Sequence, residues 1–289
     1  MLDAELAESL SATELTVGSA RHRRALARFF LDTHVEYVPE DIRWPVLDEP
    51  ARERLARLPF WQEAVTTEAE TSRKVAAAAQ LEADAAVRKA IELQGFEEQR
   101  HARLLAALIA HYRISVRTPP PFESRSLEDE FLEAGFGECF DSFFAFGLIA
   151  LASDSGYFAP ELVAIFEPVV QEEARHILFF VNWVKYRRSQ LPWWKRPLFR
   201  LRCAWVILRQ VASRMKTAQT LGQGTDEKAE NFTMSAHQEV GKDLTLHDLL
   251  GRCLSENQRR MAPYDPRLLR PRLVPTLARF LYRVLPASI

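Results

Sequence analysis

The chain has 289 residues, 47% of them hydrophobic, and a formal net charge of −1 at pH 7. This length and apolar content can bury a large core, arranged as one large domain or two modest ones. The near-neutral charge argues against a general nucleic-acid-binding protein, which would carry an excess of lysine and arginine. Three cysteines, Cys139, Cys203 and Cys253, have no paired spacing, which favours a reducing compartment over a disulfide framework.

The N-terminal sequence MLDAELAESL has neither the basic region nor the apolar run of a secretory signal. No uninterrupted apolar segment approaches the ~18 residues that a membrane-spanning helix needs. We therefore expect a cytoplasmic protein, for which only a peripheral contact with a membrane stays open.

Four long segments have apolar residues at three- and four-residue intervals: 59–82, 86–113, 127–152 and 160–188. This period predicts α-helices, and the chain as a whole reads as all-α. Short turns at 81–84 and 153–160 join the helices in pairs, whereas the connection at 117–126 is longer and rich in proline. Two antiparallel pairs joined by a crossover fit a four-helix bundle.

The flanking segments have a different character. Residues 1–57 contain short amphipathic pieces interrupted by prolines, which predicts an arm that packs on a bundle formed by 58–190. Residues 191–289 are expected to cover this bundle with additional, basic amphipathic helices, and a polar loop (LGQGTDEK) follows the first of them. These helices are predicted near 197–216, 236–260 and 272–285.

A charged pentapeptide occurs twice in the predicted bundle, as EEQRH at 97–101 and as EEARH at 172–176. Residues three apart share one face of a helix, so each copy presents one carboxylate and one imidazole in the same direction. The two half-sites are Glu98 with His101 and Glu173 with His176. Carboxylate and imidazole together suit iron, manganese or zinc, and the absence of clustered cysteines argues against a thiolate site.

Each half-site needs one more ligand from the partner helix of its pair. If the first turn is centred near position 83, the residue level with Glu98 is Glu68, which lies on an otherwise apolar or small stripe. If the second turn is centred near 155, the residue level with Glu173 is Glu138. Asp141 competes for this role, and we prefer Glu138 on register. Two divalent cations would balance the four inward carboxylates, whose burial is otherwise too costly.

This arrangement resembles the ferritin-like di-iron carboxylate superfamily over roughly 58–188. The resemblance implies that Glu98 and Glu173 bridge two iron ions, and that Glu68 and Glu138 are terminal ligands. It further implies that an acid before each bridging glutamate supports a ligand histidine and is itself held by the arginine of its own motif. The matching pairs are Glu97 with Arg100 and Glu172 with Arg175. A mixed iron–manganese pair accepts the same ligands.

The function implied by the resemblance is that of a non-haem di-iron oxidoreductase, an oxidase or monooxygenase that uses O₂ as co-substrate. Glu98, Glu173 and Glu138 are the expected catalytic residues. Small residues beside Glu138 leave room for a small apolar organic substrate: Ala134, Gly135, Gly137, Ser142 and Ala145. The sequence has no flavin or iron–sulfur motif, so a separate reductase or ferredoxin is implied as electron donor.

Two other functions stay open. One is iron oxidation or peroxide removal, as in ferritins and rubrerythrins, although the ~100 residues beyond the bundle weigh against a compact cage subunit. The other is a peripheral membrane or anionic-partner binding module whose metal is structural. A homodimer is compatible with any of these functions. Three other histidines, His111, His237 and His247, lack ligand spacing and are expected to be surface or satisfied polar residues.

The segment after the bundle is strongly basic. Between residues 174 and 225 the chain has eleven lysines and arginines and no aspartate or glutamate. Within 195–216, six residues share one helix face: Leu198, Leu201, Trp205, Leu208, Ala212 and Met215. Such a helix can lie on an anionic membrane surface or meet an anionic partner. The alternative that we favour is that it packs on the bundle while its arginines reach solvent.

Overall fold

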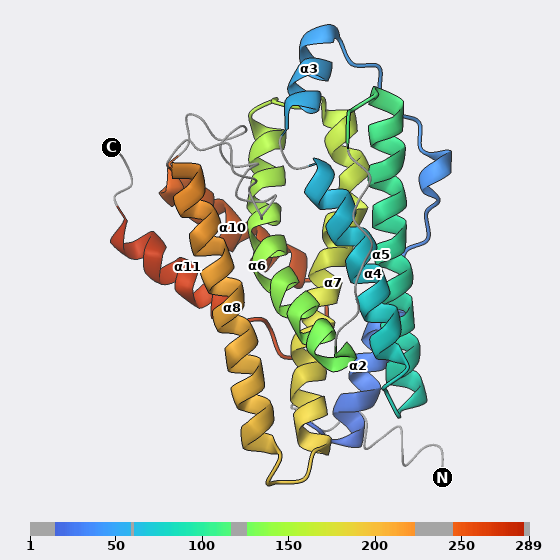
Figure 1. The fold of residues 1–289 in the computed structure, drawn as a ribbon, viewed down its shortest axis with the longest axis vertical. Helices are drawn as coiled ribbons and strands as arrows, with labels where there is room; N and C mark the ends of the chain where they lie inside the picture. Colours follow the sequence, from blue (N-terminus) through green and yellow to red (C-terminus); the bar gives the residue numbers. More distant parts are fainter. Residues whose placement is uncertain (1–14, 59–60, 117–125, 223–244, 286–289) are drawn as a thin grey trace.

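A computed structural model describes residues 15–58, 61–116, 126–222 and 245–285. Every regular element in these ranges is a helix and none is a strand, which confirms the predicted all-α class. Four long helices lie at the centre of the molecule (Figure 1). They are α4 (Trp61–Ala79), α5 (Ala85–Tyr112), α6 (Leu127–Asp154) and α7 (Pro160–Gln190).

The central helices are arranged as two sequential pairs. α4 packs against α5 and α6 packs against α7, while α4 also contacts α6 and α5 contacts α7. The observed bounds differ from the predicted ones by no more than three residues. These contacts bring the two charged pentapeptides, one on α5 and one on α7, together in the space between the four helices.

Local chemistry explains where these helices begin and end. The side chain of Asp84 accepts hydrogen bonds from the backbone N–H groups of Ala86 and Val87, which caps α5. Pro160 occupies the first turn of α7, where a missing N–H costs nothing. Gly156 has a φ of 65° in the turn between α6 and α7, a conformation that glycine adopts without strain.

The N-terminal segment packs along one side of the central helices. It contains α2 (Ala20–Asp32), the short 3₁₀ helix η1 (Pro39–Asp41) and α3 (Glu49–Arg57). α2 contacts both α5 and α7, and its Leu26 and Phe30 are completely buried. Residues 33–38 connect α2 to η1, and η1 contacts α5.

Three helices follow the central group: α8 (Arg196–Gly222), α10 (Leu246–Met261) and α11 (Leu273–Val284). α10 packs on α6 and α7, and α11 packs on α10 and α6. The predicted helix at 236–260 begins at Leu246 in the described part of the chain, and its residues 236–244 lie outside the described residues. Most of the predicted LGQGTDEK loop also lies outside them.

α8 contacts α6 and α7, but not through the apolar face that its sequence pattern singles out. Its buried residues are Phe199, Cys203 and Val206, which join the main core. Leu201 and Trp205, from the predicted apolar stripe, are 68% and 64% exposed. α8 therefore packs on the central helices, as favoured, but through Phe199, Cys203 and Val206 rather than through the apolar stripe.

Among the described residues, α6 alone is long and apolar enough to span a membrane by length and composition. This is weak evidence, because core helices of soluble proteins pass the same test. α6 is packed against α4, α7, α8 and α10, and Phe131, Phe143 and Phe146 are buried in these contacts. A position at the centre of the core accounts for its composition.

Candidate metal centre

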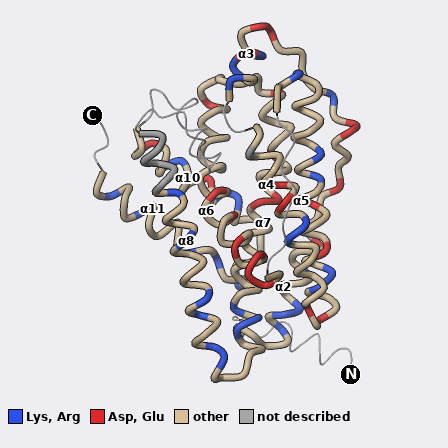
Figure 2. Tube along the Cα trace, in the orientation of Figure 1, with Lys and Arg blue, Asp and Glu red and all other residues tan. Residues whose placement is uncertain are grey.

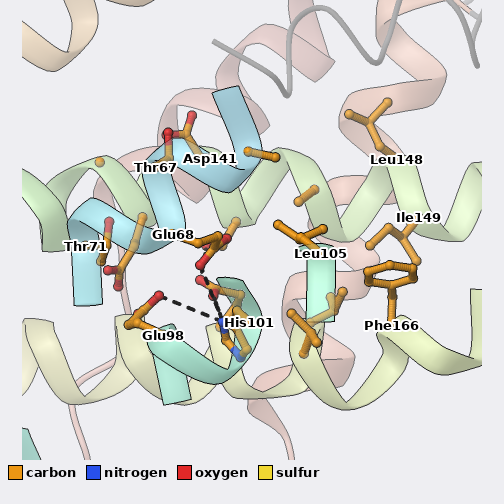
Figure 3. A pocket seen from close by; sticks show the side chains of 18 of the residues that line it. Thr67, Glu68, Thr71, Glu98, His101, Leu105, Asp141, Leu148, Ile149 and Phe166 are labelled. Atoms are coloured by element: carbon orange, nitrogen blue, oxygen red, sulfur yellow. Dashed lines mark hydrogen bonds and ion pairs between the residues drawn. The ribbon is translucent and has the colours of Figure 1, made fainter. Parts of the chain in front are cut away.

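Six carboxylate and imidazole side chains meet inside the four central helices. α5 supplies Glu98 and His101, and α7 supplies Glu173 and His176 from the equivalent positions of the repeated pentapeptide. Glu68 comes from α4 and Glu138 from α6. Figure 3 shows Glu68, Glu98 and His101 pointing toward one another from two adjacent helices.

Gly95 lets α4 and α5 approach closely beside this cluster. A Cβ at Gly95 would lie 3.2 Å from the backbone nitrogen of Ala76, and the Ser72 hydroxyl donates to the Gly95 carbonyl at 3.0 Å. The close approach sets the register of the two helices one turn from Glu98. Glu68 is thereby held on the same level as the first Glu-x-x-His motif.

The Nδ1 atoms of both histidines face the carboxylates. His101 Nδ1 lies 3.3 Å from Glu173 Oε1 and 3.6 Å from Glu68 Oε2. His176 Nδ1 lies 2.8 Å from Glu98 Oε1 and 3.7 Å from Glu173 Oε1. Because Glu98 also lies 3.8 Å from His101, each of the two motif glutamates is close to both histidines.

These six residues form two overlapping groups that could hold a metal ion. One group contains Glu68, Glu98, His101 and Glu173, and the other contains Glu98, Glu138 and His176. Within each group one ligand atom per residue lies within 4.8 Å of the others. The shared Glu98 places the two groups side by side. Asp141, the alternative to Glu138, forms an ion pair with Arg214 and belongs to neither group.

The opposite nitrogen of each histidine fixes its tautomer. His101 Nε2 lies 2.8 Å from Glu172 Oε2, and His176 Nε2 lies 2.8 Å from Glu97 Oε2. Both carboxylates also bind a buried arginine, and they accept the hydrogen bonds of the histidines. Each Nε2 therefore donates its proton outward, which leaves a lone pair on Nδ1 that points at carboxylate oxygens.

Four buried atoms of the cluster have no hydrogen-bond partner: Glu98 Oε1, Glu138 Oε1, His101 Nδ1 and His176 Nδ1. A buried unpaired acceptor is costly, and acceptors facing one another repel. Either a proton or a cation must lie between them. Imidazole nitrogens and carboxylate oxygens are ligands that iron, manganese and zinc accept, and the donor set therefore fits a metal centre.

The pKa values describe how the metal-free chain neutralises this charge with protons. Burial, followed by repulsion from Glu98 and Glu173, raises the pKa of Glu68 to about 8. Burial and the same two carboxylates raise the pKa of Glu138 well above its usual range. Burial opposes the charged form of the histidines, yet hydrogen bonds and attraction from the surrounding carboxylates raise the pKa of both His101 and His176. Divalent cations would replace these protons.

The arginine of each pentapeptide binds a carboxylate of the other pentapeptide. Arg100 of the first motif binds Glu172 of the second, and Arg175 of the second binds Glu97 of the first at 2.8 Å. The expectation that each arginine holds the acid of its own motif is therefore wrong. Within one helix, positions 97 and 100 share a side, but α5 and α7 face each other closely enough for the interhelical pairing. Although burial acts against its charged form, His176 and Arg175 hold the pKa of Glu97 well below its usual range.

The N-terminal segment contributes residues that sequence reasoning missed. His34 Nδ1 lies 2.5 Å from Glu97 Oε1, and the Tyr37 hydroxyl donates to Glu172 Oε2 at 3.4 Å. Tyr37 also stacks under the Arg100 guanidinium at 3.9 Å. Residues 33–38 thus cover the carboxylates of Glu97 and Glu172. They are not part of a helix, so no periodic pattern in the sequence could have identified them.

A cavity of about 440 Å³ adjoins the cluster and is lined there by Glu68, Glu98, His101, Glu138 and Glu173. Its other walls are largely apolar and include Leu105, Leu148, Ile149, Phe158 and Phe166. Figure 3 shows Leu105, Ile149 and Phe166 on one side of the pocket and the carboxylates on the other. The volume is sufficient for a small organic molecule.

Most of the small residues that were expected to leave this space do line the cavity: Ala134, Gly137, Ser142 and Ala145. Gly135 does not. A Cβ at Gly135 would clash with the Phe180 ring, so this glycine serves the contact between α6 and α7 instead. The Ser142 hydroxyl donates to Glu173 Oε2 at 2.9 Å, a contact with the cluster that the sequence pattern did not predict.

Comparisons with protein-family models, with curated proteins and with solved structures found no match.

The histidines that were not expected to bind metal lie outside the potential metal-binding groups wherever the structure describes them. His111 is exposed and packs edge-on against Tyr112, and His247 stacks on Tyr282 with ring centroids 4.0 Å apart. Both agree with the expected surface or satisfied roles. His237 lies outside the described residues.

Proposed function

We propose that this chain is a ferritin-like, non-haem di-iron oxidase or oxygenase that acts on a small apolar substrate. The observation that carries the proposal is the set of unpaired inward atoms on Glu98, Glu138, His101 and His176. Four carboxylates and two neutral imidazoles supply the charge and the ligand types for two divalent cations. A surface salt-bridge network would need no such cation, because solvent would hydrate its charges.

In this proposal Glu68, Glu98, His101, Glu138, Glu173 and His176 would together hold two metal ions. Two iron ions, or one iron and one manganese, suit these ligands equally. When bound, the metal pair supplies redox chemistry with O₂ that no protein side chain provides.

The chain's own residues prepare the site. Glu97 and Glu172 hold the Nε2 protons of the two histidines, so that each Nδ1 keeps its lone pair toward the centre. Arg100 and Arg175 form ion pairs with these carboxylates and hold them in position. The apolar cavity walls would bind an organic substrate next to the cluster.

Reduction of O₂ requires electrons from outside the chain. The proposed partner is therefore a separate reductase or ferredoxin, which would return two electrons for each turnover. No flavin or iron–sulfur motif occurs in the sequence to provide them internally.

The proposal is tested by metal content and by the optical spectrum of the anaerobically reduced, iron-loaded chain before and after O₂ is added. We expect two irons per chain and an oxygen-dependent charge-transfer band. Glu98→Ala should lose both, whereas Glu92→Ala, an exposed glutamate on the same helix, should retain both. A chain that binds no iron, or binds iron that is inert to O₂, contradicts the proposal.

A cavity variant separates an organic oxidase from an iron-storage protein. Ala145→Phe should fill the space beside the cluster without removing a ligand. We expect two bound irons and weakened binding of naphthalene, used as an apolar probe and followed by fluorescence. Unchanged probe binding, together with many irons per chain in a large assembly, would favour iron storage.

A further inference from the structure

The outer face of α8 and the turn before it is covered with large apolar side chains. Trp193 in the turn is 75% exposed, its neighbour Trp194 is also largely exposed, and exposed apolar residues continue along α8: Leu198, Leu201, Trp205, Leu208 and Met215. From Leu198 to Met215 the stripe extends roughly 25 Å at the helical rise. Monomeric soluble proteins rarely expose a continuous apolar strip of this length, and such strips mark interaction surfaces.

The exposed stripe is not the face through which α8 packs in the core. The opposite face of α8 already supplies Phe199, Cys203 and Val206 to the main core. Arg202 binds Glu128 and Asp129 of α6, and this contact fixes the rotation of α8 against its neighbour. The apolar stripe therefore faces outward because the inner contacts hold it there.

Unpaired positive charges accompany the stripe. Lys185, Lys195, Arg196 and Arg200 are exposed, and none forms an ion pair with a carboxylate in the described parts of the chain. Burial, with repulsion from Arg188 and Arg200, lowers the pKa of Lys185. In Figure 2 the lower part of α8 carries basic positions and no acidic ones. This surface would attract anionic groups.

α11 repeats the same combination of residue types. Its exposed apolar residues are Leu273, Leu277, Phe280 and Val284, and Arg272, Arg279 and Arg283 are exposed around them. α11 contains no acidic residue. In the view of Figure 1, α8 and α11 lie on the same side of α6.

We propose that α8, assisted by α11, docks the protein on the surface of an anionic lipid membrane. Tryptophan, leucine and methionine side chains would enter the boundary between headgroups and acyl chains, and the lysines and arginines beside them would meet lipid phosphates. Tryptophan is favoured at this boundary because its ring is apolar and its N–H is polar. A single convex helix face suits a planar lipid surface better than it suits a protein, which would need a complementary groove.

Docking would place the cavity wall next to the lipid. The inner side of α8 lines the cavity through Gln210, Ser213 and Arg214. An apolar substrate dissolved in the membrane would then be close to the space beside the metal cluster. The docking proposal itself does not depend on the metal, and it can be tested with the metal-free chain.

The test is co-sedimentation of the full chain with vesicles of phosphatidylcholine alone and of phosphatidylcholine with 30% phosphatidylglycerol. We expect sedimentation with the anionic vesicles, a blue shift of tryptophan fluorescence, and weaker binding at high salt. Leu201→Ser with Trp205→Ser should weaken binding at least ~10-fold, since both apolar anchors are removed. Lys195→Glu with Arg200→Glu should weaken it by a similar factor.

Two control variants change exposed residues elsewhere. Val46→Ser with Leu81→Ser removes apolar side chains, and Lys89→Glu reverses an exposed charge on α5. Both should bind anionic vesicles like the unchanged chain. Circular dichroism of all variants should be the same, because none of the substituted side chains is buried.

Three results would overturn the proposal. The first is no sedimentation with either vesicle, and the second is binding that the α8 variants do not weaken. The third is a dimer, measured by light scattering, that Leu201→Ser with Trp205→Ser dissociates, because the stripe would then be an interface between two copies of the chain. None of these results bears on iron binding or O₂ reactivity.

Discussion

The interior of the four central helices and the outer face of α8 both depart from the usual distribution of residues. Glu98, His101 and His176 are buried, whereas Leu201 and Trp205 are exposed. A buried charge loses its hydration, and an exposed apolar side chain keeps an unfavourable contact with water. The buried charges find partners inside the fold and, in our proposal, two cations. The apolar face can find its partner only outside the chain.

The largest expected effect comes from removing metal from the interior. At free metal about 1,000-fold above its dissociation constant, each site adds ~4 kcal/mol to the free energy of unfolding. Anaerobic thermal unfolding with Fe²⁺ and with a chelator measures this difference. Glu98→Ala should unfold at the same temperature in both. Equal midpoints for the unchanged chain would show that the cluster needs no cation.

The crossed arginines are the next test of the interior. Arg100→Gln leaves Glu172 buried without its ionic partner, and we expect a loss of about 3–5 kcal/mol in the free energy of unfolding. Arg202→Gln breaks an ion pair at a partly exposed position and should cost only about 0–1 kcal/mol. Urea unfolding of the metal-free chain measures both. Similar losses for the two variants would mean that the buried network contributes no more than a surface pair.

The stability of the metal-free chain should fall as pH rises. The pKa of Glu68 is raised to about 8 in the folded state, so the folded chain keeps a proton that the unfolded chain releases above its ordinary pKa. That stabilising contribution is complete below pH ~4.5 and is lost as pH rises through about 8. We expect a decrease on the order of 2 kcal/mol, because the Glu68 side chain is 19% exposed and partly hydrated.

Urea unfolding at pH 5, 7 and 8.5 measures this trend. Metal affinity should change in the opposite direction and increase with pH, because the cation competes with the same protons. Glu68→Gln should flatten the stability profile. Glu70→Gln, a change on the same helix outside the cluster, should leave it unchanged. A free energy of unfolding of the metal-free chain that rises from pH 5 to 8.5 would contradict the raised pKa of Glu68.

The smallest effect is expected on the outer face of α8. Leu201→Ala should change the free energy of unfolding by less than ~0.5 kcal/mol, since this side chain makes few contacts inside the fold. Phe199→Ala, two positions away on the buried face, should cost about 3–5 kcal/mol. If Leu201→Ala proves as costly as Phe199→Ala, the stripe is buried in solution, for example in an oligomer.

Much of the fold followed from local patterns. Apolar spacing predicted the four central helices, and the structure shows that Asp84 caps α5 and that Pro160 lies in the first turn of α7. The register of helices joined by short turns led to Glu68 and Glu138, and the structure brings both into the same groups as the motif residues. This works because a short turn fixes which residues of two antiparallel helices are level.

The residues that contact Glu97 and Glu172 could not be predicted from helix periodicity or from the register of short turns. His34 and Tyr37 lie in a connection without a helical period, and their contacts with Glu97 and Glu172 depend on how that connection crosses α5 and α7. The arginine pairing between helices depends on the distance and tilt of α5 and α7. Neither quantity is encoded in the spacing of residues along one helix.

The sequence by itself determined the all-α class, the positions of the central helices and the duplicated carboxylate–imidazole motif, because each depends on the period of one helix or on one short turn. Only the tertiary structure decided that Arg100 and Arg175 cross between motifs and that α8 buries Phe199 rather than Trp205. α8 has apolar residues on two faces, and the neighbouring elements select the face that is buried. That selection leaves Trp205 of α8 exposed.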